Sequence, residues 1–171
     1  MIMINEIKNH TKIKKQLLSY IKEAESDSLD LPNEVISRTD YYVEQNLNSP
    51  NSKYWNLMLE HIRPTYNNIA KKLCSKEWTI HNSWFQQYEN KDKHSWHVHP
   101  TCQFSNVYYL ELPNKDLVTE FKDKKIDVKE VEEGCLITFP SYIYHRSSIN
   151  NTNKRKTIIS FNSSFEKYDY S

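Results

Sequence analysis

The chain of 171 residues contains a single glycine, Gly134. A Walker-type phosphate loop and a dinucleotide-binding fingerprint each need several glycines at fixed spacing, because the backbone must turn tightly and approach the phosphates closely. Neither motif can be built from this sequence, which excludes P-loop nucleotide hydrolases and Rossmann-type dehydrogenases. The glycine directly precedes the apolar run CLITFP, where we expect it to supply a tight turn into a strand.

The second half of the chain has the sequence pattern of an antiparallel β protein. From residue 76 onward, segments rich in β-branched and aromatic residues alternate with polar breaks. We expect strands in the segments 78–88, 102–112, 116–121, 125–131, 135–139, 142–149 and 154–165. Short strands at a spacing of about ten residues are typical of a sandwich or barrel.

The first half reads as helical. Apolar residues recur every three or four positions in 7–24 and again in 53–73, with a turn-like stretch around Pro32 between them. Pro64 should kink or split the second helix, because proline removes a backbone donor and clashes with the preceding turn. We therefore expect one domain over residues 1–171, in which a helical layer (1–75) covers a β core (76–171).

Charge and cysteine usage limit the partners and the compartment. Lys plus Arg is 23 and Asp plus Glu is 22, and this balance argues against a dedicated nucleic-acid-binding protein. The three cysteines are scattered, as expected for free thiols in a reducing compartment. We find no secretory signal and no apolar run long enough to span a membrane, so the expected location is the cytoplasm.

Three of the seven histidines lie in informative positions. His97 and His99 occur in the sequence SWHVHP, and residues i and i+2 of a strand project from the same face. Pro100 places the pair at a strand end, since proline cannot continue regular pairing. With His145 from FPSYIYH, these imidazoles can form a three-ligand metal site that leaves coordination positions open.

Four motifs occur in a fixed order between Trp84 and Phe165: WHVHP, SNVYYLELP, EGCLITFPSYIYH and RKTIISFN. In this order the sequence resembles the 2-oxoglutarate/Fe(II)-dependent oxygenases, in particular a small H-x-H-P branch of bacteria and phage. It is more distantly similar to prolyl hydroxylases. The resemblance implies a double-stranded β-helix, the jelly-roll architecture also used by cupins.

The resemblance implies that His97, His99 and His145 bind Fe(II). Most of the superfamily has H-x-D, with a carboxylate where this chain has His99. A carboxylate cancels one positive charge of the metal, whereas a neutral imidazole cancels none. The alternative is that His99 only supports the site and that Glu111 or Glu120 completes the ligand set.

The same resemblance implies a cation for the distal carboxylate of 2-oxoglutarate on the strand after His145. The candidates are Arg155 and Lys156, and strand alternation allows only one of them to face inward. Arg155 is favoured for its chemistry, because guanidinium binds a carboxylate bidentately. The alternative without a binding role is that these residues form a solvent-exposed basic turn.

Three further residues match positions in the cosubstrate pocket of the family. Tyr109 corresponds to a tyrosine that donates a hydrogen bond to the same carboxylate, and Ser105 shares its face of the strand. Tyr88 resembles a pocket tyrosine on the preceding strand, although a tyrosine in an aromatic-rich sheet is often simply core.

The function implied by the resemblance is oxidation, by default hydroxylation, of an unknown small-molecule or peptidyl substrate with O2. The products of 2-oxoglutarate would be succinate and CO2. The alternatives are a three-histidine cupin dioxygenase that needs no 2-oxoglutarate and a non-catalytic jelly-roll binding or structural module. A nucleic-acid demethylase is disfavoured by the neutral charge. The oligomeric state is open, since the apolar stripe of the first helix suits a homodimer interface or a sheet cover equally.

Overall fold

The computed structural model describes residues 2–43 and 52–168, which form helices and antiparallel strands. In chain order the elements are β1 (Met3–Glu6), α1 (His10–Glu23), β2 (Asp27–Leu31), β3 (Glu34–Thr39), α3 (Lys53–Lys72), β4 (Ser75–Tyr88), β5 (His94–His97), β6 (Phe104–Glu111), a 3-10 turn (Lys115–Leu117), β7 (Glu120–Phe121), β8 (Cys135–Pro140), β9 (His145–Ser147) and β10 (Lys156–Tyr168).

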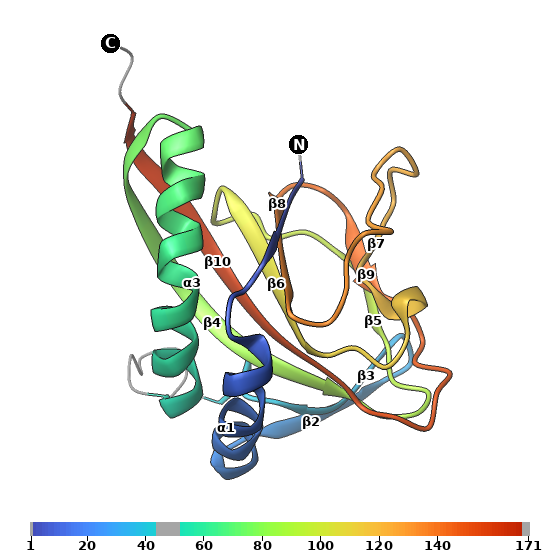
Figure 1. Cartoon of the computed structure of the whole chain (residues 1–171). Helices are drawn as coiled ribbons and strands as arrows, with labels where there is room; N and C mark the ends of the chain where they lie inside the picture. Colours follow the sequence, from blue (N-terminus) through green and yellow to red (C-terminus); the bar gives the residue numbers. More distant parts are fainter. Residues whose placement is uncertain (1, 44–51, 169–171) are drawn as a thin grey trace.

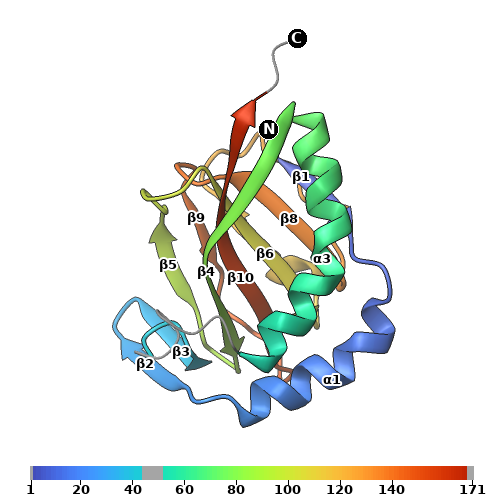
Figure 2. The same ribbon diagram turned by 90° about the vertical axis from the view of Figure 1, so that its left-hand side faces the viewer.

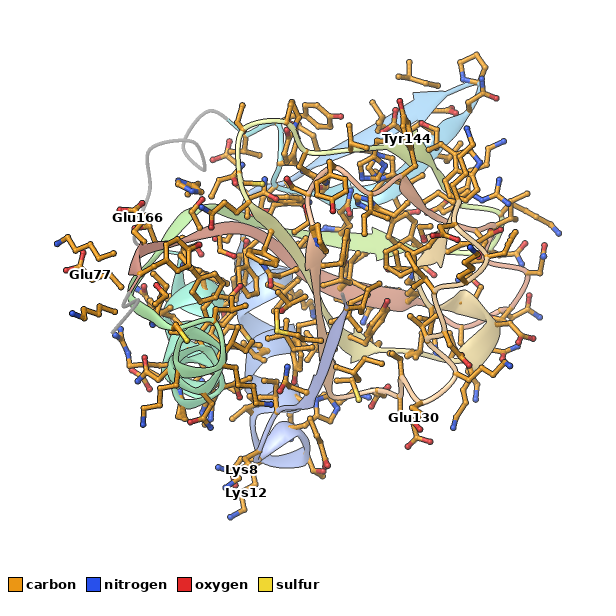
Figure 3. All side chains as sticks on the ribbon, turned by 90° about the horizontal axis from the view of Figure 1, so that it is seen from above. Lys8, Lys12, Glu77, Glu130, Tyr144 and Glu166 are labelled. Carbon is orange, nitrogen blue, oxygen red and sulfur yellow. The ribbon has the colours of Figure 1, made fainter. Side chains whose placement is uncertain are left out.

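The strands form two sheets. Within the described residues, the larger sheet has the order β1-β8-β6-β10-β4-β3-β2 and the smaller one has the order β5-β9-β7. Figures 1 and 2 show α1 and α3 on one face of the larger sheet, with the smaller sheet on the opposite side. Strands β4 and β10 pair from Lys156 opposite Tyr88 to Tyr168 opposite Ser75, and the opposed residues Glu77 and Glu166 lie near one end of the molecule (Figure 3). A mostly β protein with N-terminal helices is therefore confirmed.

The expectation of a purely helical layer over residues 1–75 is wrong. Strand β1 pairs with β8, and the hairpin of β2 and β3 extends the other edge of the larger sheet through β4. The hairpin turns at Pro32 and Asn33, in the stretch expected to be only a turn. Strand β2 is largely solvent-exposed, β3 is only partly buried, and both are rich in polar residues, so the alternation of apolar residues that predicts a strand is weak there.

Helix α3 also differs from its prediction, because it continues through Pro64 from Lys53 to Lys72. The proline ring lies on the exposed side of the helix. The opposite side carries a continuous buried stripe that packs on the larger sheet: Tyr54, Trp55, Met58, Ile62, Tyr66 and Ile69. A proline inside a helix costs about 3 kcal/mol, and burial of this many large side chains outweighs that cost.

Three of the expected strands are shortened or absent. Residues 125–131 form turns and irregular loop, and 116–121 form the 3-10 turn followed by the short β7. Of the expected strand 142–149, only His145–Ser147 is a strand, β9. Strand β5 is the strand whose end the H-x-H-P sequence predicted; it lies in a polar segment and pairs with β9. Gly134 has φ +91° in the turn before β8, as its position predicted.

Two apolar clusters divide the interior. One lies between the helices and the larger sheet, and the other lies between the two sheets, around Val107, Tyr109, Phe121, Ile137 and Phe139. The histidine-rich pocket opens beside this second cluster. None of the helices in residues 2–43 and 52–168 is long and apolar enough to cross a membrane.

Candidate metal centre

Three histidines converge between the two sheets. His97 ends β5, His99 follows two residues later, and His145 begins β9. Because β5 and β9 are antiparallel, His97 lies directly opposite His145, with ring centroids 4.2 Å apart. One ligand atom from each of the three rings lies within 4.8 Å of the other two. The spacing of ligand atoms is therefore that of a candidate metal site.

Backbone carbonyls fix two of the three rings. Nδ1 of His97 lies 2.8 Å from the carbonyl oxygen of Ser95, and Nδ1 of His145 lies 2.9 Å from that of Ile143. A carbonyl only accepts, so each Nδ1 carries the proton and donates. The Nε2 lone pair of each ring is then free to bind a metal, an arrangement usual for histidine ligands.

Burial keeps the three rings uncharged. It lowers the pKa of His145 to about 3 and of His99 to about 4, and the repulsion that a second protonated histidine nearby would cause adds to the effect. Burial also lowers the pKa of His97. All three imidazoles are therefore neutral near pH 7, which is the form that binds metals.

Neither carboxylate considered as a substitute ligand lies in this cluster. Glu111 accepts hydrogen bonds from Arg155, and Glu120 accepts from Arg146 and Lys124. Among the described residues, the group of metal-ligating side chains that comes together is His97, His99 and His145. The donor set offered here consists of imidazoles.

A buried lysine shares the pocket with the histidines. Lys156 is 1% exposed, and its Nζ donates a 2.8 Å hydrogen bond to Oγ of Ser147. The ammonium also lies 5.2 Å from the ring centroid of Tyr88 and 6.0 Å from that of Tyr109. Burial lowers the pKa of Lys156 to about 7. No acidic side chain in the described part of the chain forms an ion pair with this lysine.

Arg155, the cation favoured from the sequence, lies outside the pocket. Its Nε and Nη2 contact the two carboxylate oxygens of Glu111 at 2.8 and 3.2 Å, and its side chain is 37% exposed. Adjacent residues of a strand project to opposite faces, so only one of the pair can face inward. In this structure that residue is Lys156.

The other residues expected in the pocket do not all lie at its surface. Tyr88 and Ser105 line the pocket. The hydroxyl of Tyr109 is instead engaged by Thr119: it donates to Oγ1 at 2.7 Å and accepts from the backbone N–H at 2.9 Å. Thr119, which the sequence did not suggest, lies on the pocket wall.

Sequence reasoning missed several other pocket residues. On β10 the pocket is lined by every second residue: Lys156, Ile158, Ser160 and Asn162. The alternation in KTIISFN carries this information once one inward residue is known. His94 stacks on His97 with centroids 4.1 Å apart, and its Nε2 lies 2.6 Å from Oε1 of Glu34. The contact with the β2–β3 hairpin has no local signal in the sequence.

A second, larger cavity adjoins the histidine pocket. Its volume is about 770 Å³, and it shares His94, Arg146 and Ser147 with the pocket. Most of the residues that line it have polar side chains, and the guanidinium of Arg146 lies 4.5 Å from the ring centroid of Trp96. Residues of the smaller sheet therefore line both cavities.

No family model matches the sequence, and no curated protein matches it. Solved structures do match in fold. The viral collagen prolyl hydroxylase of Paramecium bursaria Chlorella virus-1, as its 2OG complex, has a TM-score of 0.64 at 13% identity, covering 95% of this chain and 94% of that one. A prolyl-4-hydroxylase of Pseudomonas putida has a TM-score of 0.64 at 12% identity, covering 98% and 93%.

The non-heme α-ketoglutarate-dependent epimerase SnoN of nogalamycin biosynthesis has a TM-score of 0.70 at 11% identity, covering 95% of this chain and 76% of that one. The chain shares its fold with these oxygenases. At this level of identity the likeness is one of fold, and it covers almost the whole chain, including the N-terminal elements that the sequence motifs left out.

Proposed function

We propose that this protein is an Fe(II)- and 2-oxoglutarate-dependent oxygenase whose two sheets form a double-stranded β-helix. The observation that carries the proposal is the presence, in one pocket, of three converging neutral imidazoles and a buried lysine without an acidic partner among the described residues. The shared fold with 2-oxoglutarate oxygenases supports it.

The histidine cluster fits a first-row transition metal. Imidazole nitrogen is a good ligand for iron, and three protein ligands leave coordination positions for other molecules. His97, His99 and His145 would hold the ion. When bound, iron and 2-oxoglutarate would supply the oxidising chemistry, with O2 consumed and with succinate and CO2 formed.

Lys156 fits the distal carboxylate of 2-oxoglutarate. A buried ammonium that has a neutral hydroxyl as its hydrogen-bond partner gains strongly from an anionic ligand, because charge-assisted hydrogen bonds are roughly twice as strong as neutral ones. The hydroxyl of Ser147 orients Nζ through a hydrogen bond, and the face of the Tyr88 ring stabilises the ammonium by a cation–π contact. Val107 and Ile158 give the pocket an apolar wall that limits the access of water.

The prime substrate would be a small molecule or a peptide with a C–H bond placed near the metal, and hydroxylation is the default outcome. In this role the protein binds and orients the reactants and excludes side reactions.

The all-imidazole donor set favours one alternative, a three-histidine dioxygenase that uses no 2-oxoglutarate. An enzyme of that kind would bind no anion at Lys156. Burial of an unpaired ammonium is costly, so this alternative leaves the buried lysine without an explanation. The two functions therefore differ in what they require of this one side chain.

The deciding experiment is an anaerobic titration of the purified apoprotein with Fe(II) and then with 2-oxoglutarate, followed by visible absorption. A charge-transfer band that requires both components supports the proposal. Iron binding without the band favours the 2-oxoglutarate-independent enzyme. Absence of iron binding would favour a non-catalytic jelly-roll module.

A further inference from the structure

The third histidine of the cluster is held differently from the other two. The rings of His97 and His145 are each fixed by a backbone carbonyl two residues earlier in the chain. The group that lies at Nδ1 of His99 is instead the side-chain amide of Asn162, at 3.4 Å. The ring of Trp84 stacks on His99 with centroids 5.7 Å apart, which restrains the ring plane but not its hydrogen bonding.

Asn162 is well placed for this contact. It lies on β10, on the same face as Lys156, and the strand bulges directly after it. Its side chain is buried, and its Oδ1 lies 3.4 Å from Oγ of Ser105 on the adjacent strand β6. The amide therefore bridges the strand β6 and the histidine.

The chemistry of a ligating imidazole sets a requirement on this amide. When a neutral histidine binds a metal through Nε2, the proton resides on Nδ1, and this N–H needs an acceptor. Asn162 can supply one through Oδ1. A half-turn of the carboxamide brings Oδ1 to His99 and leaves Nδ2 to donate to Oγ of Ser105. Both present contacts are long, at 3.4 Å, so neither locks the amide in the opposite orientation.

We propose that Asn162 is a positioning residue that holds His99 as the third metal ligand by accepting a hydrogen bond from its Nδ1. The inference rests on the metal site of the proposed function. The three imidazole ligands are neutral, and a supporting amide, unlike a carboxylate, adds no negative charge beside them. The metal then retains its positive charge for an anionic ligand.

The test measures Co(II) affinity and the visible Co(II) spectrum of the full chain, neither of which depends on turnover. Loss of a group that orients a ligating histidine typically weakens metal binding by about 10–100-fold. We expect Asn162→Leu to weaken Co(II) binding by that factor and to change the spectrum. Asn162→Asp keeps an acceptor at Nδ1 and should restore the affinity at least to that of the unaltered protein.

Asn82 provides a matched control. It lies directly across from Asn162 on β4, and directly opposed residues share a face of the sheet. Its Oδ1 is buried without a hydrogen-bond partner among the described residues, and no contact joins it to His99. We expect Asn82→Leu to leave Co(II) affinity and the spectrum unchanged.

A double-mutant cycle with His99→Ala assigns the effect to the proposed contact. In the absence of His99, Asn162→Leu should cause no further loss of Co(II) affinity. Equal affinities and spectra for Asn162→Leu and the unaltered protein would overturn the inference and leave the proposed function intact. Equal losses in Asn162→Leu and Asn162→Asp would also overturn it. If the unaltered protein fails to bind Co(II) and Fe(II), both the inference and the proposed function fail.

Discussion

The ammonium of Lys156 donates a hydrogen bond to Oγ of Ser147, which lies two residues after His145 on the partner sheet. This bond joins β10 of the larger sheet to β9 of the smaller one at the wall of the histidine pocket. The ammonium and the candidate metal site therefore line the same pocket. A ligand with an anionic group at one end and a chelating group at the other would satisfy both.

Replacement of Lys156 by methionine should weaken 2-oxoglutarate binding to the Fe(II)-loaded protein by about 10–100-fold, since hydrogen bonds to charged groups contribute about 1.5–3 kcal/mol. Fe(II) affinity should be unaffected. Anaerobic titration of the charge-transfer band measures both. Arg155→Ala is the matched control, because Arg155 pairs with Glu111 on the outer side of the strand. A larger effect from Arg155→Ala would reverse the assignment.

The stability of the ligand-free protein should depend on pH through the same lysine. Its pKa of about 7 in the folded state lies below the ordinary lysine value of 10.5. Between these pH values the unfolded chain binds more protons, so the free energy of unfolding should rise with pH across this window. Below pH 7 both states are charged, and the full cost of burying the ammonium is present.

The Lys156→Met variant isolates this contribution. Urea unfolding at several pH values between 7 and 10.5 should show a flatter profile for the variant, with its largest gain over the unaltered protein at the low end. An identical slope in both proteins would mean that the lysine is not desolvated in solution.

Removal of a histidine from the cluster should abolish tight metal binding. We expect His97→Ala or His145→Ala to reduce Co(II) and Fe(II) affinity by at least about 100-fold, beyond the loss typical of a merely supporting residue. Equilibrium dialysis provides the measurement. His61→Ala, on helix α3 and outside the cluster, serves as the control. Unchanged affinity in either cluster variant would remove the basis of the metal site.

Gly134→Ala should destabilise the fold. The residue has φ +91°, and an added Cβ would lie 2.9 Å from Cγ of His10. Its backbone N–H donates to the carbonyl of Tyr109, so the turn cannot simply relax outward. Strained backbone of this kind costs about 1–3 kcal/mol. Chemical denaturation measures the loss, and the additional change His10→Ala should recover the steric part of it but not the backbone part.

Much of the architecture follows from local patterns. The β-rich segments of the second half and the apolar stripes of both helices are visible in the sequence because burial imposes a period of about 2 on strands and 3.6 on helices. His97, His99 and His145 were also identifiable as candidates. A proline after H-x-H indicates a strand end without knowledge of the partner strand, and His145 lies in a second recognisable motif.

The tertiary structure decided which side chains meet. The choice between Arg155 and Lys156 depends on a strand register that bulges beside Thr157 and again after Asn162, and a shift of one residue exchanges the two faces. The contacts of Glu34 with His94 and of Asn162 with His99 join segments 60 and 63 residues apart. Such pairs arise from the packing of whole strands and sheets, and no local preference of either residue encodes them. The sequence by itself thus indicated both helices, most strands of the second half and the candidate histidines, whereas packing selected the inward cation and the groups that lie against the histidines.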